Sequence, residues 1–358
     1  MDVLGDILRI VRLRGSVYFN ACFCSPWGMD VEENSQAAFH LMVKGDAWLR
    51  LYPQVKRDNL PKTLKPSDSP FNEVINDRLI HLKEGDIVLF PTGVAHMISH
   101  APDGKCLPSK QVVDAYQKGD ALFDKTTNLD ITHSNSTHSD RTDRENSLES
   151  QDSSTSPQAM DTSNIVCGYV EFDRSLSHPF LDNLPDIIHI AAETRAQFHW
   201  LDSIIKHMVF ESANKQPGTD VLVDRFTEVL FIQVLRSYAQ LSTKEESYLS
   251  ALVDTQLSKA LSLIHDNPDR EWTVDLLALD VGMSRSSFYS RFNNYIGMPP
   301  MKYLYEWRMM QAKQKIEGTQ KPLSLVAEEV GYQSDSAFQK AFKRFFNFTP
   351  ASLRKSKK

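Results

Sequence analysis

The chain has 358 residues, of which 41% are hydrophobic and 24% charged, and its formal net charge is −6. It holds no run of about eighteen apolar residues, and Asp6, Arg9 and Arg12 interrupt its N-terminal apolar stretch, so neither a membrane span nor a signal peptide is expected. Four cysteines in a chain of this length do not indicate a disulfide scaffold. These features predict a cytoplasmic protein with more than one domain.

Charge is distributed unevenly along the chain. Residues 255–358 hold 16 Lys and Arg against 10 Asp and Glu, a balance of +6. The rest of the chain holds 24 basic against 36 acidic residues, a balance of −12. A basic C-terminal part on an acidic remainder favours a module that binds a polyanion such as nucleic acid.

Residues 15–100 contain short runs that predict β-strands. The runs "AAFHLMV" and "AWLRLY" flank a Lys-Gly-Asp turn at residues 44–46, a pattern that predicts a hairpin. The segment "RLIHLKEGDIVLFP" supplies two more strands around a turn at residues 84–86. A further strand is predicted in "NIVCGYVEFDR", so the β domain extends to about residue 178.

Residues 101–163 change in character within this β domain. Their composition is dominated by Ser, Thr, Asp and Asn, most clearly in "SNSTHSDRTDRENSLESQDSSTS". A segment with so few aliphatic side chains cannot bury enough apolar surface to offset the entropy lost on ordering. We therefore expect a disordered insertion there.

Beyond residue 179 the hydrophobic period becomes helical. The segment "VLVDRFTEVLFIQVLRSYAQL" places Val223, Phe226, Leu230 and Val234 on one helix face. Such a face fits packing within its own domain, and it also fits a helix that couples domains or forms a homodimer. The sequence thus predicts an all-β domain at 1–178, a helical coupling or dimerisation segment at 179–250 and an all-α domain at 251–358.

The C-terminal domain contains an internal repeat. Four positions recur fifty residues apart and two recur forty-nine apart: Ser284 with Ser334, Phe288 with Phe338, Phe292 with Phe342, Pro300 with Pro350, Ala278 with Ala327 and Gly282 with Gly331. In each unit a small alanine sits on a short helix, and the glycine that follows can adopt positive φ. The serine is a helix N-cap, and the two phenylalanines, four residues apart, fix the second helix to the core. This pattern predicts two helix-turn-helix units.

The second helix of a helix-turn-helix unit presents its N-terminal residues to the major groove of DNA. In the first unit the residues expected to read bases are Arg285, Ser286, Tyr289 and Ser290. In the second unit they are Asp335, Ser336, Gln339 and Lys340. The residues expected to contact phosphate are Arg291, Lys343 and Arg344. The aromatic residues near the C-terminus are assigned to the core instead: Phe338, Phe342, Phe345, Phe346 and Phe348.

The last hundred or so residues resemble a known family. The segments "MSRSSFYSRFNNYIGMPPMKYLYEWRMMQAK" and "LSLVAEEVGYQSDSAFQKAFKRFFNFTPASLR" are similar to the AraC/XylS DNA-binding domain. That resemblance implies two helix-turn-helix units joined by one long helix, which read successive major-groove segments on the same face of DNA. It implies a sequence-specific transcription regulator.

A second resemblance concerns the β domain. In "GDIVLFPTGVAH", Gly85, Pro91, Gly93 and His96 follow the spacing of the second signature of the cupin barrel. Together with "CSPWGM", "FHLMVKGDAWLRL" and "IVCGYVEFDR", this run resembles the cupin-type sensor half of one branch of AraC regulators. The first signature of metal cupins carries two His and a Glu, but here Ala38 occupies the Glu position and residues 31–34 lack histidine. The usual metal set is therefore missing.

Several side chains remain candidates for sensing a signal. His40 lies two residues beyond Ala38 and so on the same strand face, and His40, His96 and His100 are expected to line or adjoin a cavity. Two neutral imidazoles do not make a stable metal site alone, so no cofactor is predicted, while an unconventional metal at His40 and His96 stays an alternative.

The cysteines offer a redox or soft-metal alternative. Cys22 and Cys24 alternate on one strand and would present two thiols to the same side, and Cys167 lies on another strand. Buried cysteine is commonly a small hydrophobe, whereas a sensor needs an accessible thiolate of low pKa.

Two functions from different classes follow from these features. The first is a non-enzymatic transcription activator of the AraC type. It would bind double-stranded promoter DNA, act on RNA polymerase, and be controlled by a small effector, or by a redox or metal signal, in its cupin-like half. The alternative is a cupin metalloenzyme with an accessory DNA-binding tail, against which the missing ligand set argues.

Overall fold

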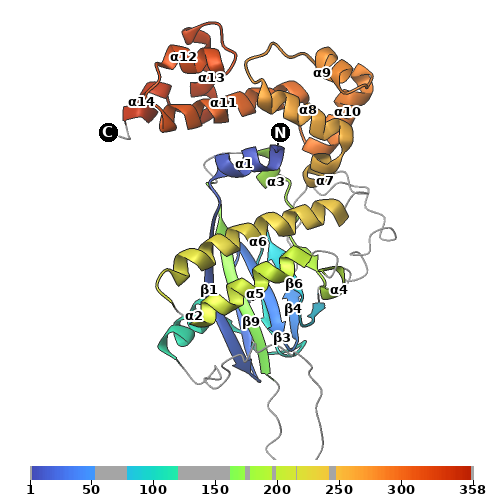
Figure 1. Cartoon of the computed structure of the whole chain (residues 1–358), viewed down its shortest axis with the longest axis vertical. Helices are drawn as coiled ribbons and strands as arrows, with labels where there is room; N and C mark the ends of the chain where they lie inside the picture. The colour runs from blue at the N-terminus through green and yellow to red at the C-terminus, as the bar shows by residue number, and fades with distance from the viewer. Residues whose placement is uncertain are drawn as a thin grey trace, which may run out of the picture.

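The computed structural model describes residues 2–52, 79–119, 162–173, 178–195, 199–214, 216–241 and 247–355. A β-rich N-terminal half lies below a helical C-terminal half, and helix α1 (Val3–Val11) lies between them (Figure 1). Asp2 caps α1 by accepting a hydrogen bond from the backbone N–H of Gly5. The fold class, a β-rich domain followed by helices, is confirmed, although one strand of the β domain lies at residues 188–190, beyond the boundary predicted at residue 178.

The N-terminal half contains two five-stranded sheets. The strands of the first sheet, in spatial order, are β1 (Arg14–Cys24), β9 (Thr162–Glu171), β3 (Ala37–Lys44), β6 (Ile87–Phe90) and β10 (Ile188–Ile190). Those of the second are β5 (Leu79–Leu82), β4 (Ala47–Leu51), β7 (His96–Ser99), β2 (Gly28–Val31) and β8 (Leu107–Pro108). The cupin-like fold is confirmed, although the strands that the structure describes form two separate sheets and not a closed ring.

The turns at residues 44–46 and 84–86 differ from the expected hairpin. Gly45 and Gly85 do adopt positive φ, at 75° and 92°. However, β3 and β6 belong to the first sheet and β4 and β5 to the second, so each turn carries the chain from one sheet to the other. The predicted β3–β4 hairpin is therefore wrong, because the local turn signal does not determine which strand pairs with which.

The insertion predicted to be disordered is partly ordered. Residues 107–118 form β8 and helix α2 (Ser109–Lys118), and β9 begins at Thr162. Val112 is buried in the interior between the sheets, and the Tyr116 hydroxyl donates to the Asn20 carbonyl at 3.2 Å. The prediction was wrong for residues 101–119 because the apolar face of this short helix was overlooked, and residues 120–161 lie outside the described residues.

The first sheet is buried on both faces. On β3, Ala38 and Met42 face the interior between the sheets, while Phe39 and Leu41 face outward. Helices α5 (His199–Asn214) and α6 (Thr219–Leu241) cover that outer face (Figure 1). The predicted apolar face of α6 is confirmed, since Val223 and its partners at 230 and 234 are buried.

From residue 247 onward, the described residues form only helices and the turns that connect them. Two short helices, α3 (Pro179–Asp182) and α4 (Ala192–Arg195), precede α5, and the domain itself comprises α7 (Tyr248–Val253), α8 (Thr255–Asp266), α9 (Val274–Asp280), α10 (Arg285–Ile296), α11 (Pro300–Gly318), α12 (Leu323–Glu329), α13 (Asp335–Phe346) and α14 (Pro350–Lys355). Helices α9 and α10 form the first helix-turn-helix unit and α12 and α13 the second, with α11 joining them (Figure 1).

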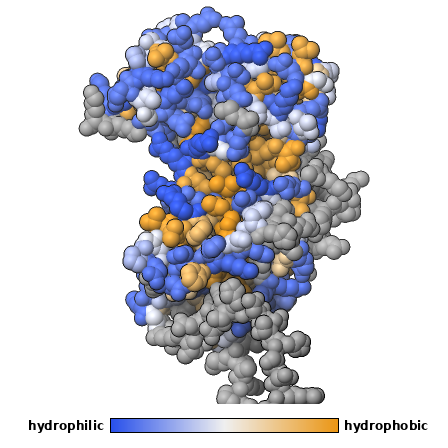
Figure 2. Space-filling model, in the orientation of Figure 1, coloured by the Kyte–Doolittle hydropathy of each residue, from blue (hydrophilic) through white to orange (hydrophobic). Residues whose placement is uncertain are grey.

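The halves share one apolar core. A single cluster of buried residues runs from Phe39 on the sheet through Phe231 on α6 and Tyr248 on α7 to Trp307 on α11. Figure 2 shows apolar surface gathered between the halves, over the α1–α6 junction, where two grooves of about 400 and 490 Å³ are lined in part by Leu4. In the part of the chain that the structure describes, no helix is long and apolar enough to cross a bilayer.

Candidate DNA interface and ligand cavity

The two predicted recognition helices are built alike. Ser284 caps α10 by accepting from the N–H of Ser287, and Ser334 caps α13 by accepting from the N–H of Ala337. Gly282 and Gly331, in the turns before them, have φ of 72° and 79°. These predicted roles are confirmed, and they leave the first turn of each helix at the protein surface.

The aromatic pairs anchor each helix as predicted. Phe288 and Phe292 are fully buried under α10, and Phe338 and Phe342 are buried under α13. Phe348 departs from the prediction because it is 37% exposed, with its ring stacked on Phe346 at 5.5 Å.

The opposite faces of both helices are open. On α10, Ser286, Tyr289 and Ser290 are exposed, three and four residues apart and so on one face. Arg285 is exposed as well but pairs with Asp275 of α9, with 3.1 Å between nitrogen and oxygen.

On α13 the predicted DNA-facing residues all lie at the surface: Asp335, Ser336, Gln339, Lys340, Lys343 and Arg344. The Arg344 guanidinium also rests over the ring of Tyr305, at 4.9 Å from its centroid. Both faces therefore offer hydrogen-bonding groups at the position where a helix-turn-helix unit meets base edges.

Arg291 is not placed like the other basic residues. Its guanidinium pairs with the Asp254 carboxylate and donates to Gln256 Oε1 at 2.8 Å. Asp254 is the N-cap of α8. The side chain therefore links α10 to α8 within the domain, where the sequence predicted a phosphate contact.

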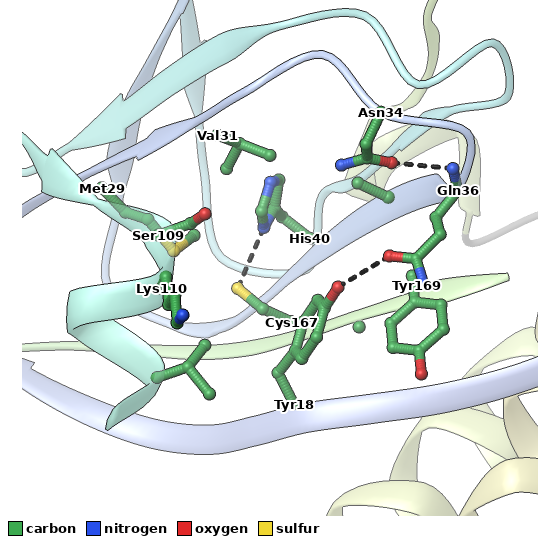
Figure 3. A pocket seen from close by; sticks show the side chains of 13 residues that line it. Tyr18, Met29, Val31, Asn34, Gln36, His40, Ser109, Lys110, Cys167 and Tyr169 are labelled. Atoms are coloured by element: carbon green, nitrogen blue, oxygen red, sulfur yellow. Dashed lines mark hydrogen bonds between the residues drawn. The ribbon is translucent and has the colours of Figure 1, made fainter. Parts of the chain in front are cut away.

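The interior of the cupin half holds a cavity of about 260 Å³ (Figure 3). Apolar side chains from several elements form part of its wall: Met29, Val31, Ala38 and Val113. Polar groups complete the lining: Tyr18, Asn34, Gln36, Ser109, Lys110 and Tyr169. At its floor lie His40 and Cys167.

Three of the predicted sensor residues meet in one hydrogen-bond chain. His40 Nε2 lies 2.7 Å from His96 Nε2, and His40 Nδ1 lies 2.9 Å from Cys167 Sγ. The Val94 carbonyl, 2.9 Å from His96 Nδ1, can only accept. His96 therefore carries its proton on Nδ1 and accepts at Nε2 from His40, and His40 in turn accepts from the Cys167 thiol.

The three hydrogen-bonded side chains, His40, His96 and Cys167, are neutral at ordinary pH. Burial lowers the pKa of His40 well below its usual value and lowers the pKa of His96 to about 4. Burial raises the pKa of the Cys167 thiol well above its usual value. Within the described residues, no three His, Cys, Asp or Glu side chains are grouped to hold a metal ion.

The other predicted sensor residues lie elsewhere. His100 contacts the backbone of Trp27 through Nδ1 and is not part of the cavity lining. Cys22 and Cys24 alternate with the buried Ala21 and Phe23 on β1, so they share the face turned away from the interior.

The prediction also missed residues that line the cavity. Tyr18 sits in a β-bulge between Val17 and Phe19, so the alternation of faces along β1 shifts there. Lys110 lies on α2, in the segment expected to be disordered. For Lys110, the available signal was the amphipathic run "SKQVVDAYQK".

Comparison with known proteins agrees with both halves. A family model described as cupin matches residues 2–240, and one described as a helix-turn-helix domain matches residues 277–356. The chain is 27% identical over 355 residues to the HTH-type transcriptional regulator AlkR of Acinetobacter baylyi, covering 99% of each chain.

Two further matches are more partial. The chain is 32% identical over 191 residues to the RCS-specific HTH-type transcriptional activator RclR of Escherichia coli, covering 53% of this chain and 67% of that one. A solved AraC-type regulator structure from Chromobacterium violaceum is 31% identical, covers 28% of this chain and 89% of that chain, and gives a TM-score of 0.27.

Proposed function

Because the chain belongs to the AraC-type transcriptional regulators that carry an N-terminal cupin domain, we propose that a small effector in the cupin cavity controls its binding to promoter DNA. The observation that carries this proposal is the cavity itself. It lies inside the sheets and is lined by side chains from both of them and from α2, with apolar walls and a few polar groups. That composition is typical of small-molecule sites.

The lining favours a small amphipathic effector. A volume of about 260 Å³ lies just below the range of drug-sized pockets, which begins near ~300 Å³. The floor is neutral, so an ionised group placed there would lose hydration without a counter-charge. A polar or anionic group is better placed beside the exposed Lys110, with the apolar body against Met29 and Val113.

A redox or metal signal is less well supported at this position. A reactive cysteine needs an accessible thiolate. Cys167 is instead buried, its thiol donates to His40, and burial raises the pKa of that thiol. The two imidazoles that a metal would use are hydrogen-bonded to each other. Because these two imidazoles are engaged with each other, we also propose that the chain is a regulator and not a cupin metalloenzyme.

The shared core offers a route from cavity to DNA. Strands β1, β3 and β9 carry cavity residues on one face, and the opposite face packs against α6. Asp173, two residues after β9, pairs with Lys313 of α11 at 3.8 Å. Arg12, which follows α1, pairs with Glu317, which also lies on α11. A change in the sheet on ligand binding would therefore reach α11, which joins the two DNA-reading units.

The effector proposal is tested with a variant that fills the cavity. Val113→Trp places a large ring in the cavity, and Gln111→Trp adds the same ring on the outer face of α2 as a control. Small amphipathic acids, alcohols and phenols are screened for a shift of Tm and of DNA affinity. We expect a hit whose effects disappear in Val113→Trp and persist in Gln111→Trp. Effects that persist in both variants would contradict the proposal.

We further propose that the regulator acts as an activator through RNA polymerase and forms a homodimer. Exposed apolar side chains on α5 and α6 support the dimer, namely Phe210, Val221, Leu222 and Val229. Sedimentation of the full chain tests it, and Phe210→Ser with Leu222→Ser should yield monomers. The activator role is tested by transcription with purified polymerase from a promoter that carries the site the protein selects from random duplex DNA. An unchanged transcript level would contradict it.

A further inference from the structure

Arg308, in the middle of α11, contacts both helix-turn-helix units. Its Nε donates to the carbonyl of Pro268 at 2.6 Å, and its Nη2 donates to the carbonyl of Arg270 at 2.9 Å. Both carbonyls belong to the loop that leads into α9 of the first unit. The same guanidinium lies 6.0 Å from the ring centroid of Tyr332, in the turn of the second unit.

The turn of the second unit is packed directly on this guanidinium. A Cβ placed on Gly331 would lie 2.6 Å from Arg308 Nη2 and 2.9 Å from the Asp269 carbonyl oxygen. Gly331 also has φ of 79°, so the absence of a side chain serves both the turn and the close approach. The loop of the first unit and the turn of the second therefore meet at Arg308.

A second polar contact crosses the same boundary. Gln333, two residues after Gly331, donates from Nε2 to Glu271 Oε1 at 2.6 Å. Glu271 lies in the loop that Arg308 holds. The two contacts are formed by different residues on both sides, so they can be removed independently.

Each helix-turn-helix unit packs on α11 through its own apolar cluster. The first unit packs on Trp307 and Met310 of α11 within the large shared core. The second unit packs on another face of the helix, around Met309 and Ala312, in a separate cluster. Phe345 and its neighbour at 346 touch both clusters. Each core fixes its own unit to α11, and the polar bridge adds a direct connection between the units.

We propose that Arg308 is a positioning residue that fixes α10 relative to α13 and thereby sets the spacing of DNA half-elements that the protein accepts. Recognition helices enter successive major-groove segments, and one added base pair shifts the second segment by about 3.4 Å and rotates it by roughly 35° about the DNA axis. A rigid pair of units cannot follow that shift. A loosely joined pair can follow it.

The test compares full-length variants on three duplexes. One duplex is the site selected by the wild-type protein, the second has one base pair inserted between its half-elements, and in the third one half-element is scrambled. For wild type, we expect the insertion to weaken binding by at least about 10-fold. For Arg308→Ala, the penalty should fall below about 3-fold, while affinity for the single half-element stays within about 2-fold of wild type.

Matched variants separate positioning from charge and folding. Lys302→Ala removes a positive charge from the exposed surface of the same helix and should keep the full insertion penalty. Arg308→Lys keeps the charge but cannot reproduce the planar fork that bonds two carbonyls, so its penalty should also fall. Gln333→Ala removes the other contact, so its insertion penalty should also fall. This variant tests the connection between the units if Arg308→Ala does not fold.

The positioning role of Arg308 presupposes that two units bind DNA, but the test distinguishes failure of that role from failure of DNA binding. If wild type shows the insertion penalty and both Arg308→Ala and Gln333→Ala keep it, the positioning role is overturned while DNA reading stands. A uniform loss of affinity for all three duplexes would also overturn it, because that result shows a contact or stability effect. If wild type shows no preference for the spacing, the claim that two units read fixed half-elements fails first.

Discussion

His40 of β3 and His96 of β7 lie with their Nε2 atoms 2.7 Å apart, and this hydrogen bond joins the two cupin sheets inside the protein. Both rings are buried, at 2% and 0% exposure. With His40 donating, the bond holds only while His96 Nε2 is unprotonated, since a proton added there would force His40 to move its own proton to Nδ1. Burial lowers the pKa of both imidazoles and so disfavours that added charge. The interior is therefore tuned to stay uncharged.

Acid should destabilise the fold through His96. Its pKa is held at about 4 by burial, against about 6.5 in the unfolded chain, so the unfolded state binds more protons between these values. Stability should be greatest above pH 6.5 and fall as pH is lowered toward 4, by on the order of 3 kcal/mol from this group. Urea unfolding from pH 7 to pH 4.5 measures the slope.

A variant without the titrating ring isolates this contribution. His96→Gln keeps an acceptor for His40 but cannot take up a proton, so its stability should change less between pH 6.5 and 4.5 than that of wild type. An equal slope in both proteins would show that other groups dominate. His178, whose pKa burial lowers to about 3, is the first of these to test.

Base reading by α13 predicts a loss confined to the specific site. Lys340→Ala or Ser336→Ala should weaken binding to the selected duplex by about 1–3 kcal/mol, because a good base contact is of this size. Binding to scrambled DNA should hardly change. Fluorescence anisotropy on both duplexes measures the difference, and an equal loss on each would show that these side chains touch only phosphate.

Salt dependence distinguishes Lys343 from Arg291. Lys343 is exposed near the end of α13, so Lys343→Ala should lower the slope of log affinity against log salt by about 0.9. Arg291→Ala should leave that slope unchanged and instead lower the free energy of unfolding by up to about 1 kcal/mol, since the Asp254 carboxylate loses its guanidinium partner but still caps α8. The reverse pattern would return Arg291 to the DNA interface.

Two glycines should respond oppositely to alanine. A Cβ at Gly168 would lie 2.3 Å from the Ser16 carbonyl oxygen and 2.6 Å from the Phe39 ring, so Gly168→Ala should destabilise by about 1–3 kcal/mol or more. At Gly318, in the last turn of α11, nothing lies within 4 Å. Gly318→Ala should stabilise by roughly 0.5–1 kcal/mol. Thermal unfolding of both variants, compared with wild type, measures these shifts.

The DNA-binding half was predictable because its signals are local. A glycine before a serine cap and two phenylalanines four residues apart specify a turn and one helix face. The glycine recurs forty-nine residues later, and the serine and phenylalanines recur fifty residues later. The fate of Arg291 was not predictable this way. Its partner Asp254 is thirty-seven residues earlier, and helix periodicity places a side chain on a face without saying what lies opposite.

The cupin half was predictable only in part, since it depends on contacts between distant strands. His40 was correctly placed beside Ala38 by strand alternation, and His96 by the spacing of its motif. Their meeting with Cys167 required the register of β3 against β9, which pairs His40 with Cys167 directly. Tyr18 was missed because its bulge breaks the alternation.

Selection of random duplex DNA on the full-length protein at about 150 mM salt is the most direct test of DNA reading by two helix-turn-helix units. We expect an enriched motif with two half-elements about one helical turn apart, one for α10 and one for α13. Recovery of sequences without any enriched motif would contradict it.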